Sequence, residues 1–270
     1  MRKFLIFMLG ALCVVSVAAQ EPDSLGTKPL TQTELEPSYT PEQAWNGAND
    51  AYIAGDYARA ERLYDRIVAD GKLSMKLYFN LANACFKQNK LGKAILYYNR
   101  ALVLAPGDED VRHNLALAEA QTKDRIESVP EFFVKSWLRK VRNTLSCRTW
   151  TAISLVALAA ALALALLFVL SQRLAVRKGG FYGMVLTLLL FVVTTGFAAV
   201  ERRVMLDREG AVVMSTAAPV KSSPDRSATD IFVLHEGTTL RVVSTLDEWS
   251  EVVIADGKKG WIESAKIERI

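Results

Sequence analysis

A repeat of 34 residues runs through the first half of the chain and limits what that half can fold into. From Thr40 onward the apolar residues recur at helical spacing, and the same residue types return 34 positions later. The equivalent pairs are Asn46 and Asn80, Ala48 and Ala82, Asn49 and Asn83, Ala60 and Ala94, and Tyr64 and Tyr98. Asn114 stands another 34 residues on and belongs to a partial third copy. Units of this length bury their apolar faces only by stacking on one another. The sequence therefore predicts an all-α solenoid over 40–127.

The repeat resembles the tetratricopeptide repeat, a helix-turn-helix unit. Small residues stand where paired helices would touch, aromatic residues stand between them, and Pro106 ends the second unit. The first unit departs from the pattern, with Ile67 where Ala is usual and Lys72 where Pro is usual. We count two full repeats and a solvating terminal helix over 108–123, whose acidic start suits the positive end of the helix dipole.

The asparagines of the repeats are the candidate binding residues. Asn46, Asn80 and Asn114 share one register, and Asn49 and Asn83 lie one turn further along the same helices. An amide offers donors and an acceptor, so a ladder of amides can hold the backbone of an extended peptide. The alternative is that these amides satisfy helix ends or packing contacts, and the sequence leaves both interpretations open. Asp110 and Asn114 stand where cations would be wanted, so capture of a C-terminal carboxylate is not expected.

Two uncharged apolar runs, 149–172 and 179–200, predict a transmembrane hairpin. Each exceeds the roughly 20 residues that cross a bilayer as a helix. We expect the spans at 151–171 and 181–200, joined by a cytoplasmic loop over 172–180. Ala157, Ala161 and Ala165 form a small-residue face on which the second span can pack.

The N-terminus predicts export. Arg2 and Lys3 precede an apolar run that ends in Ala18 and Ala19, as in a secretory signal peptide over 1–19. Residues 20–39 contain three prolines and no periodic apolar pattern, and we interpret them as a disordered tether. Basic residues in the loop of the hairpin favour a cytoplasmic loop, whereas basic residues before the first span favour the opposite orientation. We therefore base the predicted orientation on the signal peptide. We expect a two-pass protein of the cytoplasmic (inner) membrane with the repeats and the C-terminal domain on the periplasmic side.

Residues 128–150 predict an amphipathic juxtamembrane helix. Apolar residues recur at helical spacing, and basic residues take the other face. Such a helix lies at the membrane interface. The alternative is a helix packed back onto the last repeat. The net charge of +4 reflects basic residues gathered around the predicted membrane spans, where such charges contact anionic lipid headgroups. We therefore expect membrane lipid and not nucleic acid as a partner.

Beyond the membrane the period changes to alternation, which predicts about five short strands. The run from Val220 to Pro224, the segment from Leu234 to Thr238, and the Gly260-Trp261-Ile262 stretch resemble a bacterial SH3 domain over 208–270. Trp249 and Trp261 are the possible ligand surface of this SH3-like barrel, and core or rim packing is the alternative role for both.

Nothing in the sequence predicts an enzyme. His113 and His235 lie in different modules, as do Cys85 and Cys147, and no phosphate loop, nucleophile elbow or metal-ligand cluster is present. We expect no catalytic residues, no metal and no cofactor.

The order of signal peptide, repeats, membrane hairpin and SH3-like domain resembles the BatE family of aerotolerance-operon proteins. The resemblance implies a scaffold for peptide or protein partners, working beside membrane proteins with von Willebrand A domains and a MoxR-type ATPase in an envelope complex linked to stress tolerance. The alternative function is peptidoglycan binding through the barrel.

Overall fold

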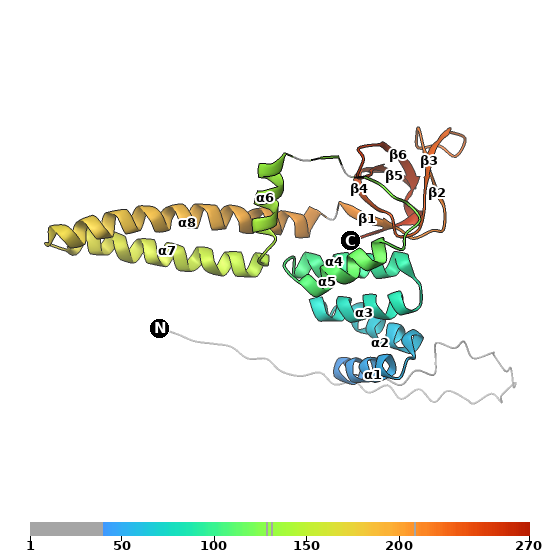
Figure 1. Ribbon diagram of the computed structural model, residues 1–270, viewed down its shortest axis with the longest axis horizontal. Coiled ribbons are helices and arrows are strands. Elements are labelled where there is room, and N and C mark those ends of the chain that lie inside the picture. The colour runs from blue at the N-terminus through green and yellow to red at the C-terminus, as the bar shows by residue number, and fades with distance from the viewer. Residues whose placement is uncertain (1–39, 128, 131, 208) are drawn as a thin grey trace, which may run out of the picture. The chain divides into compact units, whose positions relative to one another are not determined.

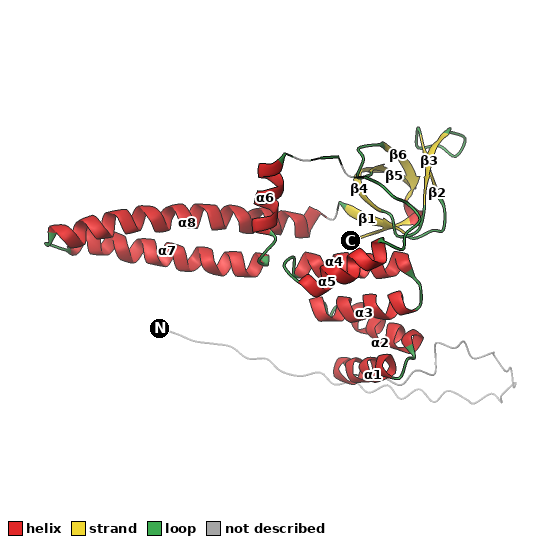
Figure 2. Ribbon diagram, viewed as in Figure 1, coloured by secondary structure: helices red, strands yellow, loops and turns green. Residues whose placement is uncertain are grey.

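The computed structural model describes residues 40–270 with the exception of 128, 131 and 208. The predicted signal peptide (1–19) and tether (20–39) lie outside the described residues. The described chain is a helical repeat region, a hairpin of two long apolar helices and an antiparallel β-domain, each built from a separate stretch of sequence (Figures 1 and 2). This confirms the predicted fold class.

The repeat region consists of α1 (Pro41–Ile53), α2 (Tyr57–Ala69), α3 (Met75–Lys87), α4 (Leu91–Leu104) and α5 (Glu109–Glu119). Polar residues start most of these helices. Thr40 and Gln43 form a reciprocal capping box on α1, and Asp56, Ser74 and Asp108 cap α2, α3 and α5. The last helix is shorter than the predicted 108–123: it ends at Glu119, whose carbonyl accepts a hydrogen bond from the Thr122 hydroxyl.

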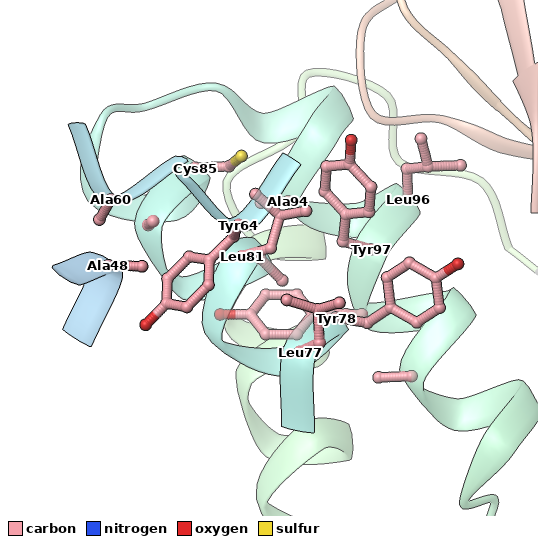
Figure 3. Close-up of a cluster of buried hydrophobic side chains, with 14 of the residues drawn as sticks. Ala48, Ala60, Tyr64, Leu77, Tyr78, Leu81, Cys85, Ala94, Leu96 and Tyr97 are labelled. Atoms are coloured by element: carbon pink, nitrogen blue, oxygen red, sulfur yellow. The ribbon is translucent and has the colours of Figure 1, made fainter. Parts of the chain in front are cut away.

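The core of the repeats follows the 34-residue equivalence. Ala48, Ala60, Ala82 and Ala94 are fully buried, which lets the paired helices approach closely. Larger side chains fill the space between the pairs, with Tyr64 and Leu81 near the centre of the cluster (Figure 3). Burial of these apolar groups is the main source of stability in a stacked fold.

The juxtamembrane segment folds as a short helix, α6 (Phe133–Arg142), and not as one helix over 128–150. The chain leaves the helix at Asn143, and the Ser146 hydroxyl accepts from the Thr149 N–H to cap the next helix. The predicted segment therefore divides between α6 and the start of the membrane hairpin.

The hairpin is formed by α7 (Cys147–Leu170) and α8 (Leu174–Asp207), two helices long and apolar enough to cross a membrane. They pack against each other through the predicted small-residue face, in which Ala157 and Ala161 are buried. The Ser154 and Thr195 hydroxyls share a hydrogen bond of 2.7 Å between the helices. The connection is shorter than the predicted loop of 172–180, because α8 already begins at Leu174 and carries Arg177 and Lys178 of that loop on its first turns.

In the described part of the chain, the β-domain is a seven-stranded antiparallel sheet in the order β3-β2-β6-β5-β4-β1-β7. The strands are β1 (Gly210–Val213), β2 (Ala218–Lys221), β3 (Asp230–Leu234), β4 (Thr239–Leu246), β5 (Trp249–Val253), β6 (Lys259–Glu263) and β7 (Ile267–Arg269). A 3-10 turn, η2 (Ser264–Lys266), precedes β7. Register shifts in β2 and β4 bend the sheet around a core that includes Val220, Val252 and Ile262.

Candidate protein-binding groove

The candidate asparagines lie on the first helix of each repeat unit. Asn46 and Asn49 are on α1, Asn80 and Asn83 are on α3, and Asn114 is on α5. Asn46 is exposed, whereas the other four are partly buried between neighbouring units. The 34-residue register therefore places equivalent amides along successive helices, as the sequence predicts.

A hydrogen-bonded network joins these amides from one unit to the next. The Tyr64 hydroxyl donates to Asn49 Oδ1 at 2.6 Å, and Asn80 Nδ2 lies 3.4 Å from the same oxygen. One repeat later the Tyr98 hydroxyl donates to Asn83 Oδ1 at 2.5 Å. Asn114 Nδ2 donates to that oxygen at 2.9 Å. The amide oxygens of Asn49 and Asn83 thus tie a tyrosine of their own unit to an asparagine of the next.

Burial raises the pKa of both Tyr64 and Tyr98, which further favours the protonated hydroxyl that donates in this network. A hydroxyl that stays protonated keeps its hydrogen bond to the amide oxygen. The pairing of Tyr64 with Asn49 and of Tyr98 with Asn83 was open to inference from the sequence, because both residue types obey the same 34-residue spacing.

A cavity of about 320 Å³ opens at the centre of this network. Its lining residues are Asn49, Tyr52, Ile53, Tyr64, Asn80 and Asn83. The amide oxygens of Asn49 and Asn83 already accept hydrogen bonds within the network. Their NH₂ groups can therefore donate to a ligand. Ile53, which is 84% exposed, adds an apolar wall. The site offers donors and an apolar surface to one ligand.

The two tryptophans of the β-domain lie on one face of the β5–β6 hairpin. Trp261 pairs with Glu251, and Trp249 pairs with Glu263, which puts both rings on the side away from Val252 and Ile262. Trp249 is buried, whereas Trp261 is partly exposed. Trp261 is thus the more accessible of the two.

The β-domain contacts the last repeat through polar pairs that the sequence analysis did not identify. Asp124 accepts hydrogen bonds from the His235 N–H at 2.7 Å and from the Thr238 hydroxyl at 2.6 Å. Arg100 on α4 donates to Glu268 at 2.9 Å.

Val212, Met214 and Ile270 pack into the apolar core of the repeats. No local sequence signal marks these contacts, because the partners are more than a hundred residues apart.

Helix α4 receives its N-terminal cap from the β-domain. Lys90 precedes the helix and provides no side-chain cap. The Gly92 N–H instead donates to Glu236 Oε1 at 2.9 Å, from 144 residues away. A side chain at position 92 would collide with Glu236, so glycine is what permits this approach. The carboxylate also lies at the positive end of the helix dipole.

The residues considered for chemistry lie apart. His113 is exposed on α5, and His235 sits in the turn after β3. Cys85 is buried, and burial raises its pKa to about 12, so the thiol stays protonated and unreactive. Across residues 40–270, leaving out the three undescribed positions, no group of three or more His, Cys, Asp or Glu side chains is placed to hold a metal ion.

Comparison with known families matches two parts of the chain. Residues 46–109 match the tetratricopeptide repeat model, and residues 216–268 match the bacterial SH3 domain model. The comparison with curated proteins yields no match. The chain therefore joins a tetratricopeptide-repeat solenoid and an SH3-like barrel, which are typically non-catalytic interaction modules, to two helices long and apolar enough to cross a membrane.

Proposed function

We propose that the protein is a membrane-anchored scaffold whose repeat groove binds an extended segment of a partner protein. The observation that carries the proposal is the cavity between α1 and α3, in which the NH₂ groups of Asn49 and Asn83 stand beside the apolar Ile53. Asn46, Asn80 and Asn114 complete the proposed contact surface along the same helices.

The chemistry of the groove selects the kind of ligand. Amide NH₂ groups donate, so they suit the carbonyl oxygens of a peptide backbone. Those oxygens are present in every extended chain, so such contacts demand little of the ligand's sequence. Tyr52 and Ile53 favour an apolar side chain at one position of the bound segment. The ligand class is therefore an extended peptide with an aliphatic or aromatic residue.

Both interaction modules belong on one side of the membrane in this proposal. A two-helix hairpin returns the chain to the side from which it entered, and the contacts of Asp124 with His235 and Thr238 support a shared compartment. The predicted signal peptide makes that compartment the periplasm. The arginines and lysine near the turn of the hairpin are then cytoplasmic, as the positive-inside rule favours.

The physiological role rests on the resemblance to the BatE family. On that basis we propose an envelope complex linked to aerotolerance or stress tolerance, with von Willebrand A domain proteins and a MoxR-type ATPase as partners. The groove would then hold an extended segment of one of these membrane neighbours.

Peptidoglycan binding through the barrel is the second candidate function. It is favoured by the match of residues 216–268 to the bacterial SH3 domain model and by the accessible ring of Trp261. In this case Trp261→Ala would reduce co-sedimentation of the detergent-solubilised protein with purified peptidoglycan, and groove variants would leave it unchanged.

Photo-crosslinking in native membranes tests the groove. A photoreactive residue in place of Ile53, which lines the cavity, should yield a discrete adduct whose partner is identified by mass spectrometry. The same residue in place of Leu73 is the matched control, because Leu73 is also exposed but does not line the cavity.

The amides provide the decisive variants. Asn49→Asp together with Asn83→Asp removes the free NH₂ donors but keeps an oxygen for each tyrosine, so the adduct at position 53 should disappear while the repeats stay folded. An adduct that persists in this double variant, or one equally strong from position 73, would contradict binding by the groove.

A further inference from the structure

Helix α6 carries an apolar face that its own chain leaves uncovered. Phe133, Val134, Trp137, Leu138 and Val141 follow one side of the helix at helical spacing. Phe133 is 71% exposed and Trp137 is 61% exposed, and no residue of α6 is buried by the described part of the protein. Exposed apolar faces of this kind mark interaction surfaces.

The opposite face of α6 is polar and looks toward the barrel. Lys135, Ser136 and Arg139 line a cavity of about 1000 Å³ together with residues of β4 and β5, among them Leu240 and Arg241. The barrel therefore stands on the hydrated side of α6. The apolar face points to the other side.

The C-terminal end of α6 is fixed to the membrane hairpin. Trp150 on α7 donates its indole N–H to the Arg142 carbonyl at 2.8 Å. Arg142 Nε also lies 2.6 Å from the buried Glu201 of α8, an ion pair rather than a well-aligned hydrogen bond. From these contacts α6 runs across the direction of the hairpin instead of along it (Figure 1).

We propose that α6 lies in the interface of the bilayer that the hairpin crosses, with Phe133, Trp137 and Leu138 among the acyl chains. Lys140 borders the apolar face and would meet lipid phosphates, while the barrel side of the helix stays in water. Helices with one basic and one aromatic face adopt this orientation. The inference rests on the proposed membrane placement of α7 and α8, and the experiment separates the two.

Fluorescence of single tryptophans in the reconstituted full-length protein tests this orientation. The protein is placed in vesicles of phospholipids brominated on the acyl chains near the headgroup, and the signal of Trp137 is obtained by subtracting the spectrum of Trp137→Phe. Two controls are built on that variant. Leu162→Trp reports from the exposed face of the hairpin, and Leu73→Trp reports from the exposed surface of the repeats.

The inference expects brominated lipid to remove most of the fluorescence of Trp137 and of Leu162→Trp, but not that of Leu73→Trp. Iodide in the aqueous phase should quench the fluorescence of Leu73→Trp most and that of Trp137 and Leu162→Trp least. If Leu162→Trp is quenched by lipid while Trp137 responds like Leu73→Trp, the helix is in water and the inference is overturned, although the hairpin is in the membrane.

Two further outcomes also contradict the inference. If no site is quenched by lipid, the membrane placement fails and the inference fails with it. If Trp137 is shielded from both lipid and iodide, the apolar face is covered by protein, and disulfide crosslinking of Phe133→Cys would show whether a second copy covers it.

Discussion

Asp124 binds both the backbone N–H and the imidazole of His235, 111 residues further along the chain and beyond both membrane helices. Lys123 Nζ lies 2.9 Å from Nε2 of the same ring. A lysine ammonium only donates, so Nε2 accepts and Nδ1 carries the proton that is given to Asp124. One carboxylate therefore fastens the turn 235–238 of the barrel to the end of the repeats.

Replacing Asp124 with Ala should loosen the barrel from the repeats. The substitution removes the carboxylate that accepts from His235 and Thr238, and hydrogen bonds to a charged group contribute about 1.5 to 3 kcal/mol each. Hydrogen exchange of the amides at 235–238 should become faster in the detergent-solubilised protein. Asp50→Ala, on the exposed side of α1, is the control and should leave this exchange unchanged. Equal protection in both variants would mean that the turn is held without Asp124, by its backbone hydrogen bonds with Val213 and by packing.

The repeats should lose stability in acid through Glu61. Burial alone would raise the pKa of Glu61, but hydrogen bonds from Lys90, Lys93 and Gln88 outweigh it and lower the pKa from 4.5 to about 2. A lowered pKa in the folded state gives stability that is complete above pH 4.5 and is lost as the pH falls toward about 2.

Thermal unfolding measured by circular dichroism at several pH values checks this prediction. The Glu61→Gln variant should melt at a lower temperature than the native protein at pH 7, and the difference should shrink between pH 4.5 and 2. Glu42→Gln, at an exposed position of α1, should follow the native curve. A constant difference across this range would show that Glu61 acts through packing and not through its charge.

Ala94→Trp should unfold the repeats. Ala94 is fully buried where α4 meets its neighbours, and overpacking of a tight core costs about 1 to 3 kcal/mol or more. Ala58→Trp on the exposed side of α2 is the matched control and should melt like the native protein.

The comparison is best made in residues 40–127. We expect this fragment to fold alone but to melt at a lower temperature than in the whole chain, because Val212 is then missing from the core. Unchanged melting of Ala94→Trp would place that residue outside a helix contact.

Tyr98→Phe should destabilise the repeats without affecting the capture of a partner. The hydroxyl donates inward to Asn83 and does not line the cavity, and its loss removes a hydrogen bond of about 0.5 to 1.5 kcal/mol. A lower melting temperature with an unchanged adduct from position 53 is the expected result. Loss of the adduct in the folded variant would instead show that the network positions the groove for binding.

Topology is tested by reporters that work only outside the cytoplasm. Fusions after Lys123 and after Ile270 should both be active, since the hairpin returns the chain to the exported side. Activity of a cytoplasmic reporter at either position, with none outside, would reverse the proposed arrangement.

Periodic features of the sequence were sufficient to predict the architecture. The 34-residue spacing of Ala60 with Ala94 and of Tyr64 with Tyr98 predicts the helix pairs, because equivalent positions meet equivalent neighbours in a stacked fold. Alternating residues predict the strands in the same way. The end of α6 at Asn143 and the early start of α8 were not predicted, since apolar spacing alone does not fix helix ends.

The contacts made by the asparagine side chains could be predicted only in part. Their register indicates a shared surface, but whether an amide faces a ligand or a tyrosine depends on packing between units. The contacts of Glu236 with Gly92 and of Asp124 with His235 could not be predicted, because they depend on how two modules dock that are separated in the chain by two long apolar helices. No periodic pattern in the sequence marks residues that form such long-range pairs.

The cap that Glu236 supplies to α4 also orders events during synthesis. The ribosome completes α4 long before Glu236 exists, so this helix lacks its N-terminal cap while α7 and α8 are being made. Val212 reaches the core of the repeats with the same delay. A nascent chain that stalls before the barrel is finished would hence display an incompletely covered repeat region, which a protease or chaperone could distinguish from the finished protein.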